Sequence, residues 1–267
     1  PGELRLYNQV ASAAFTNMAG RLKLGPGAAF TDANAVLAFY PGSVLDVSEL
    51  GTWTLSAGQT LAGTLSVIGD ASLQGRVIPG WSAGTIVFSN GVTLNNAALE
   101  IELASDGTVG GGVNDLIEIH GAATFSGLTT LTIQPLENEF TASRYAIITN
   151  LGARTGGAAN FALAMGVMTN SRYGFALNDS DPNAIWLDVS GANKTLVWRG
   201  GAGSSFWNVR GTTNNFLDGA TPETFWQADH VRFDQTAYSL MSTGRYAVTI
   251  SEPLAPATIT VDSGRSY

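Results

Sequence analysis

Residues 63–149 decide the fold. The stretch begins GTLSVIGDASLQGRVIPGWSAGTIVFSNGVTLNNAALEIEL (residues 63–103), continues NDLIEIHGAATFSGLTTLTIQPL (residues 114–136) and ends RYAIIT (residues 144–149). Short runs of alternating apolar and polar residues are separated by Gly, Asn, Asp and Pro, the residues that favour turns. The pattern predicts a series of short β-strands, each with one buried and one exposed face.

The alternation is clearest in residues 99–103. Leu99, Ile101 and Leu103 fall on one face, and Glu100 and Glu102 fall on the other, because strand side chains repeat with a period of two. Two further strands repeat this arrangement: Ile117 and Ile119 against Glu118 and His120, and Leu131 and Ile133 against Thr130, Thr132 and Gln134. We therefore expect an aliphatic inner face and a polar outer face.

The rest of the chain carries similar runs. Strands are expected at residues 15–18, 21–24, 44–47, 53–55, 61–68, 86–88, 145–149, 172–177, 184–189, 246–250 and 257–261. Residues 9–18 also allow a short helix. Residues 1–50 are weakly patterned, whereas residues 51–267 hold two repeat-like segments, at about 63–149 and 195–261.

Strand spacing of about ten residues suggests coils of roughly 20 to 25 residues, each with two or three strands. One such coil cannot bury its apolar face alone, so successive coils would stack with parallel strands. The pattern therefore predicts a solenoid. The alternative is a β-sandwich, which would instead have hairpins and antiparallel ladders.

The composition of the chain excludes several classes of function. The 267 residues are 45% hydrophobic and 13% charged, with a net charge of -8. That charge would repel a phosphate backbone, so we expect no nucleic-acid partner. No apolar run approaches the roughly 20 residues of a membrane-spanning helix. The absence of cysteine fits export of an unfolded chain, and it removes thiol chemistry and cysteine-based zinc sites.

Four segments in order carry a family resemblance: residues 78–85 (IPGWSAGT), 99–103 (LEIEL), 115–119 (DLIEI) and 121–131 (GAATFSGLTTL). In order and spacing they resemble the passenger domains of bacterial autotransporters, in which a proline-glycine turn, an acidic alternating strand and a glycine-bounded strand recur. Trp81 stands where such passengers usually have Asn.

A second segment, from residue 195, resembles another repeat of these passengers, with the elements W-x-G, W-(D/N), T-x-N-(W/F) and G-D-x-V-x-F-D. The matching residues are Trp198, Gly200, Trp207, Asn208, Thr213, Asn215, Phe216, Asp229, Val231, Phe233 and Asp234.

The resemblance implies an all-β, right-handed parallel β-helix with short coils, exported by type V secretion and anchored at the outer membrane through a downstream β-barrel. The chain begins at Pro1 without an initiator Met, so we expect it to be a piece of a longer protein.

The implied function is adhesion to a host-cell or matrix protein or glycan, with specificity in loops such as residues 152–160 or in the outward-facing strips of the strands. Self-association in aggregates and biofilm is one alternative, and a polysaccharide-cleaving enzyme is another.

Candidate chemistry is sparse. Glu100, Glu102, Glu118 and His120 could share an outward face, where two carboxylates could cleave a glycoside. We interpret them instead as ordinary outward residues of alternating strands. His120 and His230 are the only histidines, and neither has a metal-ligand neighbour at a suitable spacing. No catalytic residue, metal site or cofactor is predicted.

Two loops invite other interpretations. Asp179 and Asp181 could hold a hard cation, although turn formation explains them with fewer assumptions. Gly110, Gly111 and Gly112 lack the following Lys and Ser/Thr of a phosphate-binding loop.

The aromatic-rich segment from residue 195 could stack on sugar rings or form a core. It contains Trp198, Phe206, Trp207, Phe216, Phe225 and Trp226. We favour the core, since aromatic rings that pack together explain the repeat without a ligand.

Overall fold

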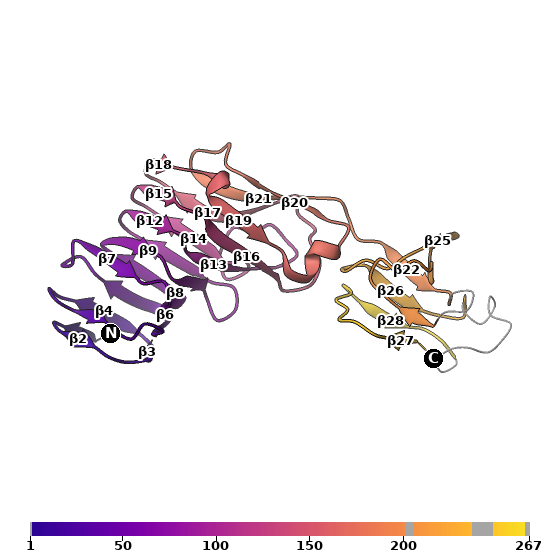
Figure 1. Cartoon of the computed structure of the whole chain (residues 1–267), viewed down its shortest axis with the longest axis horizontal. Coiled ribbons are helices and arrows are strands. Elements are labelled where there is room, and N and C mark those ends of the chain that lie inside the picture. The colour runs from indigo at the N-terminus through magenta and orange to yellow at the C-terminus, as the bar shows by residue number, and fades with distance from the viewer. Residues whose placement is uncertain (1, 201–204, 237–247, 265–267) are drawn as a thin grey trace. The chain divides into compact units, whose positions relative to one another are not determined.

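The computed structural model describes residues 2–200, 205–236 and 248–264, and in these ranges the regular elements are β-strands and two 3-10 helices (Figure 1). The chain forms two compact units. The first comprises Pro1–Gln134, Ala142–Ala164 and Ala176–Asp188; the second comprises Pro135–Thr141, Met165–Phe175 and Val189–Tyr267.

The strands, in chain order, are β1 Glu3–Leu6, β2 Gln9–Val10, β3 Ala14–Asn17, β4 Gly20–Leu24, β5 Ala29–Phe30, β6 Val36–Asp46, β7 Thr52–Leu55, β8 Thr60–Ile68, β9 Asp70–Leu73, β10 Arg76–Pro79, β11 Thr85–Phe88, β12 Val92–Asn95, β13 Ala98–Leu103, β14 Leu116–Ile119, β15 Ala123–Ser126, β16 Thr129–Pro135, β17 Arg144–Asn150, β18 Arg154–Thr155, β19 Phe161–Ala164, β20 Gly174–Asn178, β21 Ala184–Ser190, β22 Thr195–Trp198, β23 Phe206–Trp207, β24 Phe216–Asp218, β25 Thr221–Glu223, β26 His230–Phe233, β27 Thr249–Ile250 and β28 Ile259–Val261. The 3-10 helices are η1 Ala158–Asn160 and η2 Gly166–Asn170. Among these residues, no helix has the length and apolar character needed to cross a membrane.

The core of the first unit consists of apolar side chains stacked in register. Leu37 pairs with Leu61, Leu61 with Val77, and Val77 with Leu99, and all four side chains are fully buried. The predicted alternation is thus confirmed, because inward residues of successive strands lie one above the other and remove each other from water.

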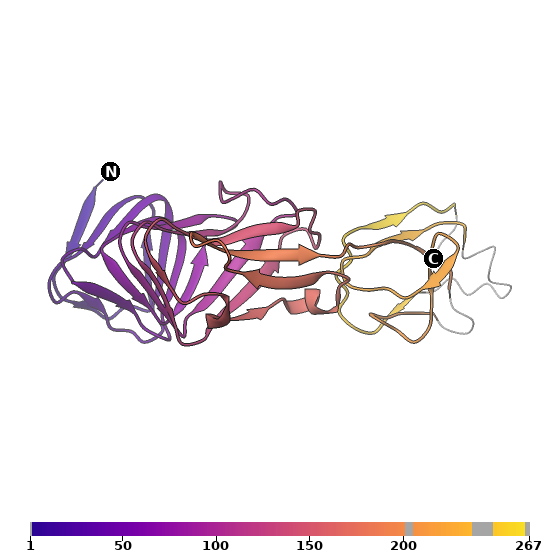
Figure 2. The same ribbon diagram turned by 90° about the horizontal axis from the view of Figure 1, so that it is seen from above.

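Two sheets surround this core. In Figure 1 the strands of the five-stranded sheet, ordered β18-β15-β12-β9-β7, lie side by side, and each pair is parallel. The 14-stranded sheet A contains the path β19-β16-β13-β10-β8-β11-β14-β17-β21-β20. Sheet A is mixed and nearly closes on itself like a barrel. Its strands curve around the interior of the first unit (Figure 2).

The expected right-handed parallel β-helix is wrong for this chain. Strands β17 and β21 pair antiparallel, as do β22 with β24 and β24 with β25 in the second unit. Only Gly219 and Ala220 connect β24 to β25, and Gly219 has a φ of 60°. A two-residue connection can form a hairpin but not a parallel crossover. Alternation along one strand does not distinguish these pairings, since it reports only which face is buried.

The expected strands that the structure describes are found at or near their predicted positions. Residues 9–18 form β2 and β3, so the short-helix reading is wrong. The expected strand at residues 246–250 lies in part outside the described residues, and β27 covers its end.

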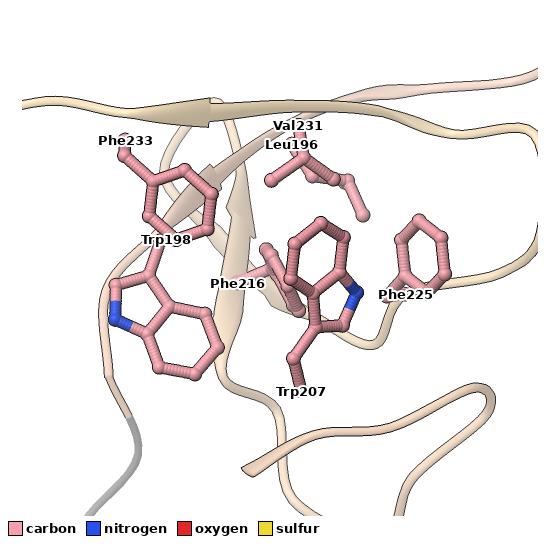
Figure 3. Packing of buried hydrophobic residues seen from close by; sticks show 7 residues of the cluster. All are labelled: Leu196, Trp198, Trp207, Phe216, Phe225, Val231 and Phe233. Atoms are coloured by element: carbon pink, nitrogen blue, oxygen red, sulfur yellow. The ribbon is translucent and has the colours of Figure 1, made fainter. Parts of the chain in front are cut away.

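The second unit has an aromatic core of its own. Its members are Leu196, Trp198, Trp207, Phe216, Phe225, Val231 and Phe233. Figure 3 shows their side chains gathered between the strands. The rings of Trp207 and Phe225 meet edge to face, with centroids 5.2 Å apart, and those of Trp198 and Phe216 at 5.1 Å. Edge-to-face contacts of this kind add to the stabilisation from buried area.

Candidate functional site

The four polar residues considered for glycoside cleavage do not lie on one strand or on neighbouring strands. Glu100 and Glu102 lie on β13, whereas Glu118 lies on β14 and His120 directly after it. Strands β10, β8 and β11 lie between β13 and β14 along sheet A. Glu100 is paired with Arg76, and the His120 Nε2 atom lies 2.5 Å from Glu118. The structure thus pairs Glu100 and Glu118 with separate local partners.

His230 belongs to the second unit and His120 to the first. The His230 ring contacts the Thr258 hydroxyl at 2.8 Å and the Asn193 carboxamide at 3.1 Å. Its Nε2 atom lies 3.6 Å from the Glu139 carboxylate. Both hydrogen-bonding positions of the ring are therefore used within the protein.

The two aspartates of residues 179–181 form turn contacts. Asp179 accepts a hydrogen bond from the Ala158 N–H, and Asp181 accepts from the Asn183 N–H. Arg154 donates to the carbonyls of Asp179, Asp181 and Ala184. Loop residues 152–160, proposed as a specificity loop, are thereby fixed, and they include β18 and η1. In the described part of the chain, no cluster of three or more His, Cys, Asp or Glu could hold a metal ion.

Gly110, Gly111 and Gly112 form the tip of the loop between β13 and β14, each with positive φ. Asn114 closes the base of this loop. Its Oδ1 atom accepts from the Ala104 N–H at 2.7 Å, and its Nδ2 atom donates to the carbonyls of Asp106 and Thr108. The glycines therefore form the tip of a loop that is held by its own hydrogen bonds, and we do not interpret it as a phosphate-binding loop.

The structure divides the aromatic residues of the second unit into three groups. Trp198, Trp207, Phe216 and Phe225 are buried in the core, as expected. Trp226 is half-buried, with the guanidinium groups of Arg172 and Arg210 at 5.4 and 4.5 Å from its ring. Phe206 remains 47% exposed.

Phe206 borders a cleft of about 220 Å³ in the second unit. The lining residues are Phe206, Asn208, Gly211, Thr212, Thr213, Asn215, Phe216 and Phe225. None of these side chains is titratable, so the lining provides hydroxyl groups, carboxamides and aromatic faces but no charge. Such a lining suits recognition of a neutral polar ligand better than acid-base chemistry.

Local hydrogen bonds hold the walls of this cleft. The Asn215 Nδ2 atom donates to the Phe206 carbonyl at 2.6 Å. This hydrogen bond holds together the two ends of residues 206–215, the loop that supplies most of the lining. Phe206 also pairs with Thr249 in the β23–β27 ladder, and the Val209 N–H donates to Glu252. The cleft is therefore built on an ordered frame.

Asn208 supplies a polar atom without a hydrogen-bond partner among the described residues. Its Oδ1 atom is buried and accepts no hydrogen bond from the residues that the structure describes. A buried carboxamide oxygen without a donor costs about 1 to 3 kcal/mol, so a ligand hydroxyl that reached it would recover that energy. The Asn208 side chain is half-buried and lines the cleft.

A second hollow, of about 380 Å³, lies in the first unit beside Phe30, Trp53 and Gln59. The Gln59 carboxamide is fully used there: it donates to the carbonyls of Phe30 and Asp32 and accepts from the Ser56 N–H. This hollow therefore lacks the unpaired group that distinguishes the Phe206 cleft.

Sequence reasoning singled out Phe206, Phe216 and Phe225 as sugar-stacking candidates, and the cleft brings these three together. It named Asn208, Thr213 and Asn215 only as repeat elements, and it missed Gly211 and Thr212, which lie in an irregular loop without periodic signal.

Comparisons with protein-family models, with curated proteins and with solved structures find no match to this chain.

Proposed function

We propose that this chain is a non-catalytic adhesin that recognises a neutral sugar in the Phe206 cleft. The observation that carries the proposal is an exposed aromatic ring next to an unpaired amide oxygen, in a lining without charge. An aromatic face attracts the C–H groups of a pyranose ring, and amides and hydroxyls select among its hydroxyl groups.

The size of the cleft supports a small ligand. Its volume of about 220 Å³ lies below the ~300 Å³ at which pockets for larger organic ligands begin. One sugar ring at the end or side of a glycan chain is therefore the expected occupant. The net charge of -8 disfavours heavily sulfated glycans, which would be repelled over the whole surface.

We further propose that the protein is presented outside a Gram-negative cell, as a passenger of the autotransporter type. Support comes from the shared role of the resembling segments. The buried Asp115 carboxylate accepts hydrogen bonds from the N–H groups of Gly84 and Glu102, one in each neighbouring segment. The absence of cysteine is compatible with export.

The test is a screen of the whole chain against neutral and anionic glycans, followed by calorimetric titration of the best ligand. We expect binding of a neutral glycan. We expect Phe206→Ala and Asn208→Ala each to weaken it about tenfold, since a lost stacking or hydrogen-bond contact is worth about 1 to 1.5 kcal/mol.

Asn214→Ala is the matched control. Asn214 is exposed in the same loop but does not line the cleft, so its replacement should leave affinity unchanged. Binding that is insensitive to both Phe206→Ala and Asn208→Ala, with circular dichroism unchanged, would contradict the proposal.

Self-association is a second candidate function. In the described residues β28 lies at one end of its sheet, and Ile259 and Val261 on it are 56% and 67% exposed. An edge strand with exposed β-branched residues is a template for pairing with another copy. Sedimentation at rising concentration tests this: Val261→Lys should reduce association if β28 mediates it, and unchanged association would exclude that edge.

A further inference from the structure

Trp81 is a large aromatic residue held in an exposed position on the first unit. It lies in the turn between β10 and β11 and is 55% exposed. Its Nε1 atom donates to the Phe39 carbonyl at 3.3 Å, and its ring lies beside that of Tyr40, with centroids 5.7 Å apart and planes inclined by 31°. The two rings form an aromatic platform, hereafter the Trp81–Tyr40 platform.

Backbone geometry explains how Trp81 reaches Tyr40. Strand β8 lies between β6 and β10 in sheet A, and its Gly63 forms a bridge with Gly80. Gly63 has a φ of 110°, and a Cβ atom there would lie 1.7 Å from the Phe39 carbonyl oxygen. Residue 63 therefore places no side chain between Trp81 and Phe39, and the indole extends across β8 to the Phe39 carbonyl.

The other side of the turn is also fixed. The Gly84 N–H donates to the buried Asp115 carboxylate at 2.7 Å. Trp81 is thus anchored by its own indole nitrogen and by the backbone three residues later. A platform that is ordered before binding loses little conformational entropy when a ligand stacks on it.

The three strand segments that meet at the platform carry no charged side chain. The strand segments that meet at this corner, residues 36–45, 60–69 and 79–88, contain no Asp, Glu, Lys or Arg. They supply the hydroxyl groups of Tyr40, Thr64 and Ser82. A nucleic-acid base would also stack on such rings, but its phosphate requires basic residues that these segments lack.

We propose that the Trp81–Tyr40 platform binds a neutral hexose or N-acetylhexosamine unit of a glycan, in addition to any ligand of the Phe206 cleft. The indole ring stacks against the C–H face of the sugar, and the neighbouring hydroxyls form hydrogen bonds at its edge. A second copy of the chain is a poorer occupant, because a stable interface needs about 800 Å² on each partner, far more than two rings provide.

The test uses the whole chain labelled with ¹⁵N at tryptophan, whose indole N–H signals resolve each ring by NMR. Trp81→Phe assigns the Trp81 signal by its disappearance. Titration with neutral oligosaccharides of glucose, galactose and N-acetylglucosamine should shift that signal. Trp81→Ala should weaken binding of the active sugar about tenfold, as expected for loss of a stacked ring.

Leu128→Ala is the matched control, since Leu128 is 56% exposed, close to the value for Trp81, and has no aromatic partner among the described ring contacts. Phe206→Ala separates the two sites: it should leave the shift of the Trp81 signal intact even if it abolishes binding in the cleft.

Three results would overturn the proposal that the platform binds a sugar. They are no shift of the Trp81 signal with any neutral oligosaccharide, equal sugar affinity of wild type and the Trp81→Ala variant, or concentration-dependent dimerisation of the wild type that the Trp81→Ala variant lacks. The last result would assign the rings to a contact between copies.

Discussion

At the scale of single residues, Asp115 is the most unusual titratable group of the first unit. Its carboxylate is fully buried and accepts the N–H groups of Gly84 at 2.7 Å and Glu102 at 2.8 Å. Among the ion pairs of the described residues, none includes Asp115. Burial therefore raises the pKa of Asp115 to about 7, although the two backbone hydrogen bonds oppose the rise.

This pKa predicts a pH dependence of stability. The folded state holds the Asp115 proton more tightly than the unfolded state, whose pKa is near 3.8. The contribution to the free energy of unfolding is therefore largest below pH ~4 and falls as pH rises through ~7. Between pH 5 and pH 8, urea denaturation should show wild type losing up to about 3 kcal/mol relative to Asp115→Asn, which cannot ionise. Parallel pH profiles of the two proteins would contradict this.

At the scale of elements, the paired strands β6 and β8 depend on glycine for two separable reasons. Gly42 and Gly63 both have positive φ, at 85° and 110°. A Cβ atom at Gly42 would meet nothing within 4 Å, whereas one at Gly63 would collide with the Phe39 carbonyl. The two positions thus form a matched pair, with backbone strain in both and steric overlap in one.

We expect Gly42→Ala to cost about 1 kcal/mol, the lower end of the range for a strained backbone. Gly63→Ala should cost more than about 3 kcal/mol or prevent folding, since β6 and β8 must separate to admit the methyl group. Urea denaturation and amide exchange of β6 measure both effects. An equal loss of unfolding free energy in the two variants would contradict this, because it would show that the steric overlap at residue 63 is relieved at no cost.

At the scale of the whole molecule, the two units have separate cores. The aromatic cluster of the second unit contains only residues of that unit, with Trp207 near its centre. Trp207→Ala should destabilise the second unit by about 3 to 5 kcal/mol, the usual cost of deleting a buried aromatic ring. Hydrogen exchange should show lost protection in β22 and β26 and preserved protection in β8, β11 and β13. Equal loss in both units would show a single cooperative structure instead.

Periodicity predicted the elements of the first unit well but not their pairing. The buried row of Leu99, Ile101 and Leu103 follows from alternation alone. The antiparallel pairing of β17 with β21 does not, because the period of two is the same in both kinds of sheet. The direction of pairing depends on connections, which are encoded in loop lengths and turn geometry rather than in apolar rows.

The candidate site shows a similar limit. Phe206 and Trp207 are adjacent in β23 and point to opposite faces, so composition could not tell which ring is buried and which is exposed. Thr212 and Gly211 reach the cleft through an irregular loop, where no periodic rule applies. Trp81 departs from the resembling pattern, but its contact with Tyr40 crosses an intervening strand and has no local sequence signal.

The loop at residues 104–114 has a practical consequence. Asn114 and Asp115 bind its base to the sheet, and the tip at Gly112 has open space around it. A foreign peptide inserted between Gly111 and Gly112 would thus lengthen this loop without disturbing the register of the flanking strands β13 and β14. The tip is accordingly a natural position for an epitope tag or a fluorophore-binding insert, a handle for displaying or tracking the folded protein.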